Sequence, residues 1–459
     1  MKQDHEDLPL EDPRTKIRRA LGAAEPDPAL RARVIGSMPI DPGGGSRWQW
    51  AAGGVAVLLA VTIVAGLVFV RQRGPAHSAS TGQLVGSLTM TAHLDFQCTL
   101  PVQGYLSQGR ISLPDGGVTV DQTQSPGKGT PTFGSVYVGG KWLPVPWTWL
   151  SPDGRSYAYI TSTSGVPGQP QTATVYVHDI AKGTDRKLWS GSGSAQMIIG
   201  WGPGGVYFPL QPTASGQGFI GQEVWVVDPA NPSAAHRVGP NPPQTAAPGV
   251  PTVPLFLFGT RIAGGAAWTV KQVISQGPIP SAAGSISRDP AQVLRMDLKD
   301  GSLSTWFTAP DGTNVGIAGT DQQGHPILII TTTPNVVKPT QASSGAPVTM
   351  PPELIYPPPP RVLLLTSANQ TVEISSGSDA TFRPSSAFGD GHGIWFTSPG
   401  SLWLYRHGSL AKVADVPASL FPLPTPPPNA PTPPANFTKP SPPPGYPIGV
   451  PLNVLGPCA

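Results

Sequence analysis

Charged residues and cysteines are scarce in this sequence of 459 residues. Only 12% of the residues are charged, against about 25% in an ordinary soluble domain. The net charge is +3, and the basic residues are scattered along the chain, whereas a nucleic-acid-binding surface needs them clustered. This distribution excludes nucleic acid as the expected partner.

Motifs of catalysis and metal binding are also missing. There is no G-x-S-x-G nucleophile elbow, and the histidines show neither H-x-H nor H-E-x-x-H spacing. Only Glu223, Glu353 and Glu373 supply glutamate after residue 71, and most of the aspartates stand in turns, where they cap their own backbone. His325 and His392 follow corresponding turns and could approach each other, but turn histidines are usually solvated. The sequence therefore predicts no catalytic residue, no cofactor and no metal site.

Glycine and proline are abundant, with 55 and 59 residues, and they accompany 39% hydrophobic residues and twelve tryptophans. Glycine and proline alone would indicate disorder. Together with so many apolar and aromatic residues they favour many short strands joined by tight turns, which is an all-β fold.

One long apolar segment stands near the N-terminus. From Trp50 to Val70 the sequence WAAGGVAVLLAVTIVAGLVFV carries no charge, and a helix of this length spans roughly 30 Å, the thickness of the hydrocarbon core. Arg47 precedes the segment, and Arg71 and Arg73 follow it as interfacial anchors. A cleaved signal peptide is the alternative, but arginines stand where small cleavage-site residues are expected. We therefore predict one uncleaved transmembrane helix.

The chain divides into five parts on this basis. Residues 1–47 form a polar tail with short helices, 48–71 the membrane helix, 72–108 a linker and lead-in strand, 109–416 a repeat domain and 417–459 a proline-rich tail. The last part has sixteen prolines in 43 residues, a composition typical of polyproline II or disorder.

The polar N-terminal tail contains the sequence PDPALRARVIGSMP at residues 26–39. Asp27 followed by Pro28 is a helix-start signal, and the sequence predicts an earlier short helix from Arg14 to Ala23. The segment resembles the juxtamembrane part of bacterial anti-sigma-like anchored regulators, although their Cys/His zinc cluster is absent. The resemblance implies a cytoplasmic protein partner for residues 14–36, and a disordered tail is the alternative.

The two cysteines, Cys98 and Cys458, both follow the apolar segment and bracket the repeat domain. An isolated pair of this kind is typical of a disulfide in an oxidising compartment, although two unrelated thiols remain the alternative. The charges flanking the membrane helix are nearly balanced, so the cysteines decide the orientation. We predict a single-pass protein of the cell membrane, with a cytoplasmic N-terminus, an extracytoplasmic C-terminal domain and a disulfide that straps the ring.

The domain after the linker contains an internal repeat. Each copy has two pairs of short apolar segments: a tight turn joins the two segments of a pair, and a variable loop joins the two pairs. The clearest copy is 147–162 with 172–189. The others are 198–210 with 223–238, 257–270 with 292–307, 315–330 with 361–375, 387–398 with 401–415, and a plainer first copy, 109–120 with 135–145. Six units of four short strands predict a six-bladed β-propeller, with seven blades as the alternative and no strand exchange between the ends.

The clearest copy reads WTWLSPDGRSYAYITS, with Ser151, Pro152, Asp153 and Gly154 at its first turn. It resembles the WD-like repeat of TolB-type bacterial propellers over about residues 110–415. The resemblance implies a rigid binding platform without fixed chemistry. Recurrent strand tryptophans are expected to pack between blades; they are Trp149, Trp201, Trp225, Trp268, Trp395 and Trp403.

The excess length of the repeats lies in four loops, at 163–171, 211–222, 274–291 and 331–360. Each joins the second and third strands of a unit, so all four are expected on one rim, where variable loops on a rigid scaffold usually bind ligands. The expected function is a membrane-anchored, extracytoplasmic binding scaffold or envelope sensor for a protein, peptide or glycan. A transmembrane regulator with the propeller as sensor, or a propeller glycosidase or lyase, is the alternative.

Overall fold

The computed structural model describes fourteen stretches of the chain. They are residues 82–123, 136–163, 171–195, 197–211, 222–242, 254–257, 259–271, 290–332, 358–375, 379–421, 441–443, 446–447, 449 and 452–459. The predicted membrane helix between Trp50 and Val70, and the predicted helices within 14–36, lie outside these residues. Within the described stretches, no helix combines the length and apolar character needed to cross a bilayer.

Short antiparallel strands dominate the described residues, where they form six sheets and one separate hairpin. The first sheet has the order β1 (Gln83–Ser87), β5 (Gly117–Thr123), β4 (Ser107–Leu113), β3 (Cys98–Gln103) and β27 (Asn453–Val454). The second contains β8 (Ser156–Ser162), β9 (Thr172–Asp179) and β10 (Thr184–Ser192). The third contains β11 (Gly200–Gly202), β12 (Gly205–Leu210), β13 (Glu223–Val227) and β14 (His236–Pro240).

The remaining sheets follow the same plan. The fourth contains β15 (Arg261–Ala263), β16 (Ala266–Lys271), β17 (Gln292–Asp297) and β18 (Leu303–Thr308). The fifth contains β19 (Thr313–Thr320), β20 (Pro326–Thr332), β21 (Arg361–Ser367) and β22 (Gln370–Ile374). The sixth has β23 (Ser386–Asp390), β24 (Gly393–Ser398), β25 (Ser401–Arg406), β26 (Ser409–Asp415) and β2 (Thr89–Met90). The hairpin is β6 (Val136–Val138) with β7 (Lys141–Leu143), and two 3-10 turns are η1 (Trp147–Trp149) and η3 (Pro232–Ala234).

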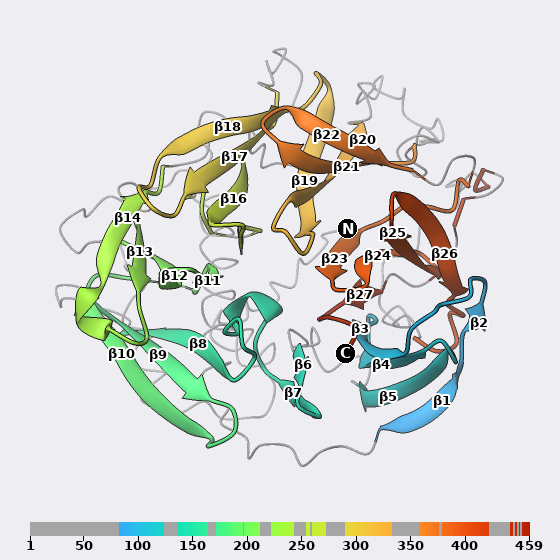
Figure 1. The fold of residues 1–459 in the computed structure, drawn as a ribbon, viewed down its shortest axis with the longest axis horizontal. Helices are drawn as coiled ribbons and strands as arrows, with labels where there is room; N and C mark the ends of the chain where they lie inside the picture. The colour runs from blue at the N-terminus through green and yellow to red at the C-terminus, as the bar shows by residue number, and fades with distance from the viewer. Residues whose placement is uncertain are drawn as a thin grey trace, which may run out of the picture. The chain divides into compact units, whose positions relative to one another are not determined.

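The sheets of this domain follow one another around a common centre (Figure 1). Their inner strands contact in sequence, β11 with β15, β15 with β19, β19 with β23, and β23 with β27. Each pair of neighbours from the second sheet to the sixth, and the sixth with the first, shares a buried apolar cluster. This arrangement is a β-propeller, as the internal repeat predicted.

Alternation along each strand explains how a sheet is held between two neighbours. In β9, Ala173, Val175 and Val177 are buried against the third sheet, while the residues between them are half-exposed on the other face.

Tight turns join the first two strands of a unit. At Ser151–Gly154 the Ser151 hydroxyl donates a hydrogen bond to Asp153 at 2.6 Å. Gly154 has φ +66°, a conformation that costs little only without a Cβ.

The strand pairs of the last four predicted units are confirmed in full, and the unit at 147–189 lacks a regular first strand. There Leu150 forms only an isolated bridge with Tyr157. The first predicted unit is wrong, because 135–145 forms the separate β6–β7 hairpin instead of completing the sheet of 109–120. That sheet is completed by β1, β3 and β27, which come from regions predicted to be linker and tail. The propeller therefore extends beyond both predicted boundaries, 109 and 416.

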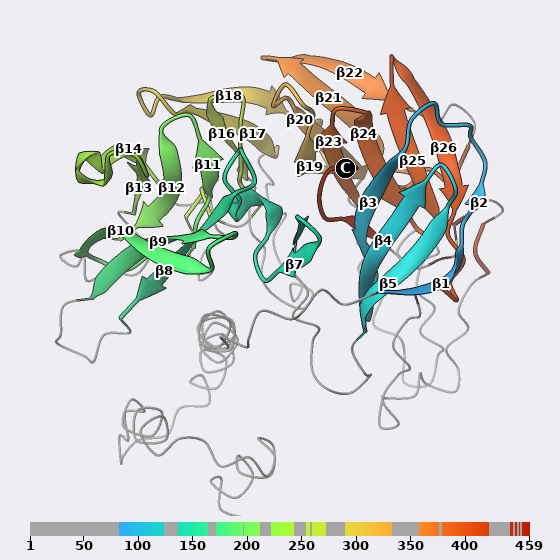
Figure 2. The same ribbon diagram turned by 60° about the horizontal axis from the view of Figure 1, so that its bottom comes forward.

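The hairpin lies between β8 and β5 in both views (Figures 1 and 2). Its apolar residues pack against Leu150 and Tyr157 of the second-sheet region. Towards the first sheet the contacts are polar: Trp142 Nε1 donates to Asp121 at 2.9 Å, and Arg110 lies over the Tyr137 ring. Among the described residues, this is the one junction of neighbouring sheets without a shared apolar cluster.

The predicted long loops fall mostly outside the described residues. The strands on either side of each loop are described: the four loops follow β8, β12, β16 and β20 and precede β9, β13, β17 and β21, respectively. Each joins the second and third strands of its unit, as predicted. The rim on which the loops themselves lie stays a prediction. In the sixth sheet the same connection is the short turn at Pro399–Gly400.

Inner strands of the fifth and sixth sheets approach each other closely at glycine. A Cβ placed on Gly319 would lie 2.2 Å from the Ala387 carbonyl oxygen, and one on Gly389 would lie 2.4 Å from the Thr320 oxygen. Real Cβ atoms do not come this close to backbone, so a side chain at either position would force the two sheets apart. Glycine is therefore required where the inner strands meet.

Gly319→Ala should lower the free energy of unfolding by about 1–3 kcal/mol, the usual cost of overpacking a rigid contact. The matched control is Gly316→Ala in the same strand, where an added Cβ would meet nothing within 4 Å. Urea denaturation followed by tryptophan fluorescence measures both. Equal midpoints for the two variants would contradict the close approach.

Candidate functional site

The first and sixth sheets are joined at their outer edge by the N-terminal strands of the domain. β1 pairs with β5 of the first sheet, and β2, two residues further on, pairs with β26 of the sixth. Leu88 between them is buried in the apolar cluster of this junction. The chain therefore crosses from one sheet to the other on the outside of the ring.

The same two sheets are joined at their inner edge by the C-terminal residues. β27 pairs with β3, with Asn453 opposite Gln103 and Val454 opposite Val102. At the end of the chain Thr99 and Ala459 exchange backbone hydrogen bonds of 2.7 and 3.2 Å. The expectation that no strand is exchanged between the ends is therefore wrong, because the ring is closed by exchange at both edges.

The proline-rich tail predicted at 417–459 is anchored at both of its ends. Phe421 is fully buried in the cluster shared by the first and sixth sheets, and Leu452 is buried in the same cluster. Nearer the end, Arg383 lies over the Tyr446 ring at 4.4 Å. The proline-rich stretch therefore connects two fixed points of the propeller, and its last residues are part of the first sheet.

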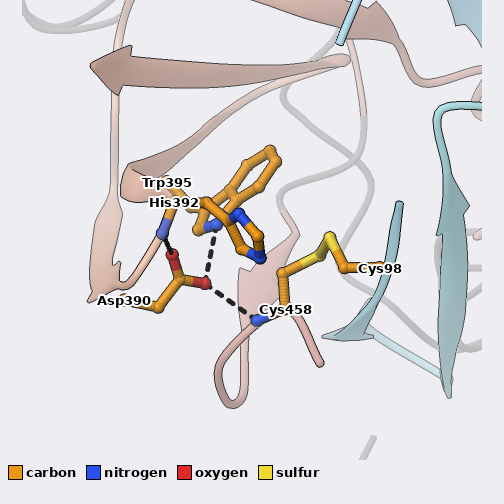
Figure 3. The surroundings of a disulfide bond; sticks show 5 residues. All are labelled: Cys98, Asp390, His392, Trp395 and Cys458. Carbon is orange, nitrogen blue, oxygen red and sulfur yellow. Dashed lines mark hydrogen bonds between the residues drawn. A yellow bond between two sulfur atoms is a disulfide. The ribbon is translucent and has the colours of Figure 1, made fainter. Parts of the chain in front are cut away.

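A disulfide joins Cys98 at the start of β3 to Cys458, the penultimate residue (Figure 3). The Cα atoms are 5.3 Å apart, and 360 residues separate the two cysteines. This is the pair that the sequence predicted. Both sulfurs lie in the buried cluster between the first and sixth sheets, so the bridge fixes the C-terminal strand against the inner edge of the first sheet.

Asp390, at the end of β23, connects the sixth sheet to this bridge. Its Oδ2 accepts hydrogen bonds from the Cys458 amide at 2.8 Å and from Trp395 Nε1 at 2.9 Å (Figure 3). Its Oδ1 accepts from the His392 amide at 2.8 Å. The carboxylate is buried, and three N–H groups compensate its loss of water. Sequence reasoning treated the aspartates as turn caps and missed this role, since no local signal links residues 390 and 458.

An aromatic and charged contact lies beside the Asp390 turn at this junction. Phe96 stacks on His392 with ring centroids 4.1 Å apart, and Arg406 lies over the Phe96 ring at 5.4 Å. Arg406 also forms an ion pair with Asp95. The hydrogen bond from Arg406 lowers the pKa of Asp95 below its ordinary value. The segment before β3 is thereby attached to the sixth sheet.

His325 and His392, on corresponding turns, each contact a different residue. His325 Nδ1 is 2.9 Å from Asp321 Oδ2 in its own turn, while His392 stacks on Phe96. The described stretches contain no group of three or more His, Cys, Asp or Glu residues placed to hold a metal ion. The recurrent tryptophans pack between sheets as predicted. Trp268, Trp395 and Trp403 are buried, and Trp149, Trp201 and Trp225 are partly buried against the apolar cluster shared by the second and third sheets.

A small cleft lies between the third and fourth sheets, away from the closure. Its volume is about 260 Å³. It is lined by Pro242, Leu255, Lys271, Gln292, Leu294, Leu303, Ser304 and Thr305. The lining is apolar at Leu255, Leu294 and Leu303 and polar at Lys271 and Gln292, and three of its residues belong to the outer strand β18.

No protein-family description matches the sequence, and no curated protein is detectably similar to it. Several solved structures show a limited likeness to the chain. TolB from Acinetobacter baumannii is 11% identical with a TM-score of 0.32, covering 71% of this chain and 65% of TolB. The acylaminoacyl peptidase of Pyrococcus horikoshii is 12% identical with a TM-score of 0.32, covering 70% of this chain and 46% of the peptidase. The β-propeller domain of the Trilobed protease from Pyrococcus furiosus is 10% identical with a TM-score of 0.34, covering 71% of this chain and 85% of that domain.

The chain thus spans less than two thirds of the length of TolB and less than half of the peptidase. At these identities the likeness concerns the fold alone. The assignment of a propeller rests on the order, pairing and packing of the chain's own sheets.

Peptide mapping under non-reducing conditions should find the peptides of Cys98 and Cys458 linked and no free thiol. In the chain-entropy account, a bridge closing so long a loop stabilises by up to about 6 kcal/mol, because it restricts the unfolded chain. The Cys98→Ala/Cys458→Ala variant should therefore unfold at lower urea concentration. Quantitative alkylation of both cysteines without reductant would contradict the bridge.

Asp390→Asn should destabilise the closure by about 1–3 kcal/mol, because an amide cannot accept all three of these hydrogen bonds and places a donor against a donor. Asp311→Asn, in an exposed turn, is the matched control and should be neutral. Urea midpoints measured with the disulfide intact give the comparison. A neutral Asp390→Asn variant would show that the carboxylate does not hold the tail.

Proposed function

We propose that this protein is a membrane-anchored, extracytoplasmic β-propeller that acts as a binding scaffold or envelope-sensing module. The disulfide between Cys98 and Cys458 is the observation that carries the proposal, since such bridges persist in oxidising compartments. The uncharged segment from Trp50 to Val70 supplies an anchor long enough for a bilayer. The N-terminal tail then lies in the cytoplasm and the propeller outside.

We assign six blades, one to each of the six sheets. The second blade keeps only three regular strands and an isolated bridge at Leu150 in place of its innermost strand. The β6–β7 hairpin is then an insertion between the first and second blades. This assignment places both ends of the domain at a single junction, where the first and sixth blades are held by β2, β27 and the disulfide.

Ligand binding is assigned to the rim that carries the long second-to-third connections. Four consecutive blades insert extra residues at this one topological position, whereas their hairpin turns have two to five residues, apart from the eight-residue connection 228–235 between β13 and β14. A rigid, cross-linked ring with variable connections on one rim suits recognition of a protein, peptide or glycan.

A transmembrane regulator is the second candidate function. It is favoured by the helix-start signal Asp27-Pro28 and the short apolar stripe of Leu30, Val34 and Ile35 just before the anchor. Residues 14–36 would bind a cytoplasmic protein while the propeller senses the envelope. Binding of an isolated 1–47 peptide to a cytoplasmic partner, with loss on Leu30→Asp, would favour this candidate over a passive scaffold.

The protein should remain in the membrane pellet after carbonate washing. Protease added to intact spheroplasts should remove the epitopes of residues 74–459 and leave those of residues 1–47 protected, because only the former face outward. Detection of each end by a terminal tag, with detergent-lysed cells as the control, gives the measurement. A soluble mature protein beginning near His77 would contradict the anchor.

A further inference from the structure

The outer strand of the fourth blade, β18, lacks the charged residues that the outer strands β10, β14 and β22 carry. The outer strand β1 of the first blade is uncharged as well. Its six residues, LSTWFT, carry no charge, and Leu303, Ser304 and Thr305 are exposed. Natural proteins usually protect such edges with charged residues. β10 carries Asp185, Arg186 and Lys187, whereas β18 presents an uncharged edge.

The hydrogen-bond alternation of the β17–β18 hairpin shows which backbone groups face away from the sheet. The Asp297 amide donates to the Ser302 oxygen at 2.9 Å, and Ser304 lies opposite Arg295. Because bonded and non-bonded positions alternate in antiparallel pairs, the backbone groups of Leu303 and Thr305 face outward. Further along, the Trp306 oxygen already accepts a hydrogen bond of 2.7 Å from the Asn369 amide of the fifth blade.

The cleft between the third and fourth sheets lies directly beside this edge. Leu303, Ser304 and Thr305 form one wall, and Leu255 and Leu294 provide apolar surface. Its volume of about 260 Å³ is below the roughly 300–1,000 Å³ of small-molecule sites. It suits one or two apolar side chains better than a whole cofactor.

Lys271 gives the cleft a positive charge. It lies opposite Gln292 at the end of β16, and both residues line the cleft. Among the described residues no carboxylate forms an ion pair with Lys271. A ligand that brings its own carboxylate would therefore complement this end of the cleft.

We propose that β18 and the adjoining cleft bind an extended peptide segment of another protein. The segment adds a short strand to β18 at Leu303 and Thr305, inserts an apolar side chain between Leu255 and Leu294, and presents a carboxylate to Lys271. Main-chain bonds supply affinity and the cleft supplies selectivity, as in other cases of strand addition. This site lies at the outer edge of the fourth blade, and the inference goes beyond the ligand binding proposed for the long-loop rim.

The test is a selection of displayed random dodecapeptides against the full-length protein in detergent micelles. Enriched sequences should be extended and proline-poor, with an apolar residue close to an acidic residue or to the peptide's free C-terminus. Synthesis of each winner as the acid and as the C-terminal amide distinguishes the two sources of the carboxylate. Affinities are measured by fluorescence anisotropy.

Two protein variants and one peptide series locate the site. Thr305→Pro removes an outward N–H at an edge, where proline is tolerated, and should weaken binding at least tenfold. Lys271→Glu should do the same for acidic peptides, whereas Lys299→Glu, in the exposed β17–β18 turn, should leave the affinity unchanged. N-methylation of alternate peptide amides should abolish binding without altering the protein, which keeps the test valid if Thr305→Pro fails to fold.

Failure of selection to enrich any peptide, or winners that bind Thr305→Pro and Lys271→Glu as tightly as the natural sequence, would overturn the site. The same holds if no N-methylated peptide loses affinity. These results would leave anchoring and topology standing, since carbonate washing and protease protection test those separately. A protein that proves soluble but still binds such peptides at β18 would contradict the membrane anchor and leave the peptide site standing.

Discussion

A ring of sheets is only as stable as the junction where its first and last members meet. Every other junction in this propeller joins sheets that are adjacent in the sequence, so the chain itself keeps them together. The first and sixth sheets are held by β2 on the outside, by β27 on the inside, and by the bond between Cys98 and Cys458. Apolar burial, backbone pairing and a covalent bond therefore act on the same junction, and the rest of the ring depends on it.

Asp390 connects the apolar packing, the backbone pairing and the disulfide of this junction. A buried carboxylate is costly unless hydrogen bonds replace its water, and here one oxygen accepts both from Trp395 within the sixth sheet and from the Cys458 amide of the tail. The last residues of the tail are thus fixed by two sheets at once. The junction between the first and second sheets is built differently, because Trp142 of the β6–β7 hairpin donates a hydrogen bond to Asp121 of the first sheet, which Arg110 of the same sheet also contacts. The ring therefore has one cross-linked junction and one polar junction next to each other.

Features that depend on neighbouring residues can be predicted from the sequence, whereas features that depend on residues far apart in the chain cannot. The turn Ser151–Gly154 and the alternation of β9 are local, and so are the strand pairs of the four complete units; a reader of the sequence finds them. The first unit was misread because its strands come from residues 83–87, 98–103 and 453–454, far apart in the chain. Nothing within a window of ten or twenty residues distinguishes Asn453–Val454 from the proline-rich stretch before it, so its place in a sheet could not be predicted.

The sequence by itself determined that the domain after the apolar segment is all-β, that its strands come in repeated groups, and that its two cysteines bracket the repeats. These properties depend on period, composition and spacing, which need no neighbours in space. The tertiary structure alone decided which strands close the ring, that Asp390 serves the tail as well as its own turn, and that the cleft beside β18 carries Lys271. Each of these requires residues from different blades to meet, and antiparallel pairing and close packing choose such partners by shape and hydrogen bonding rather than by order in the chain.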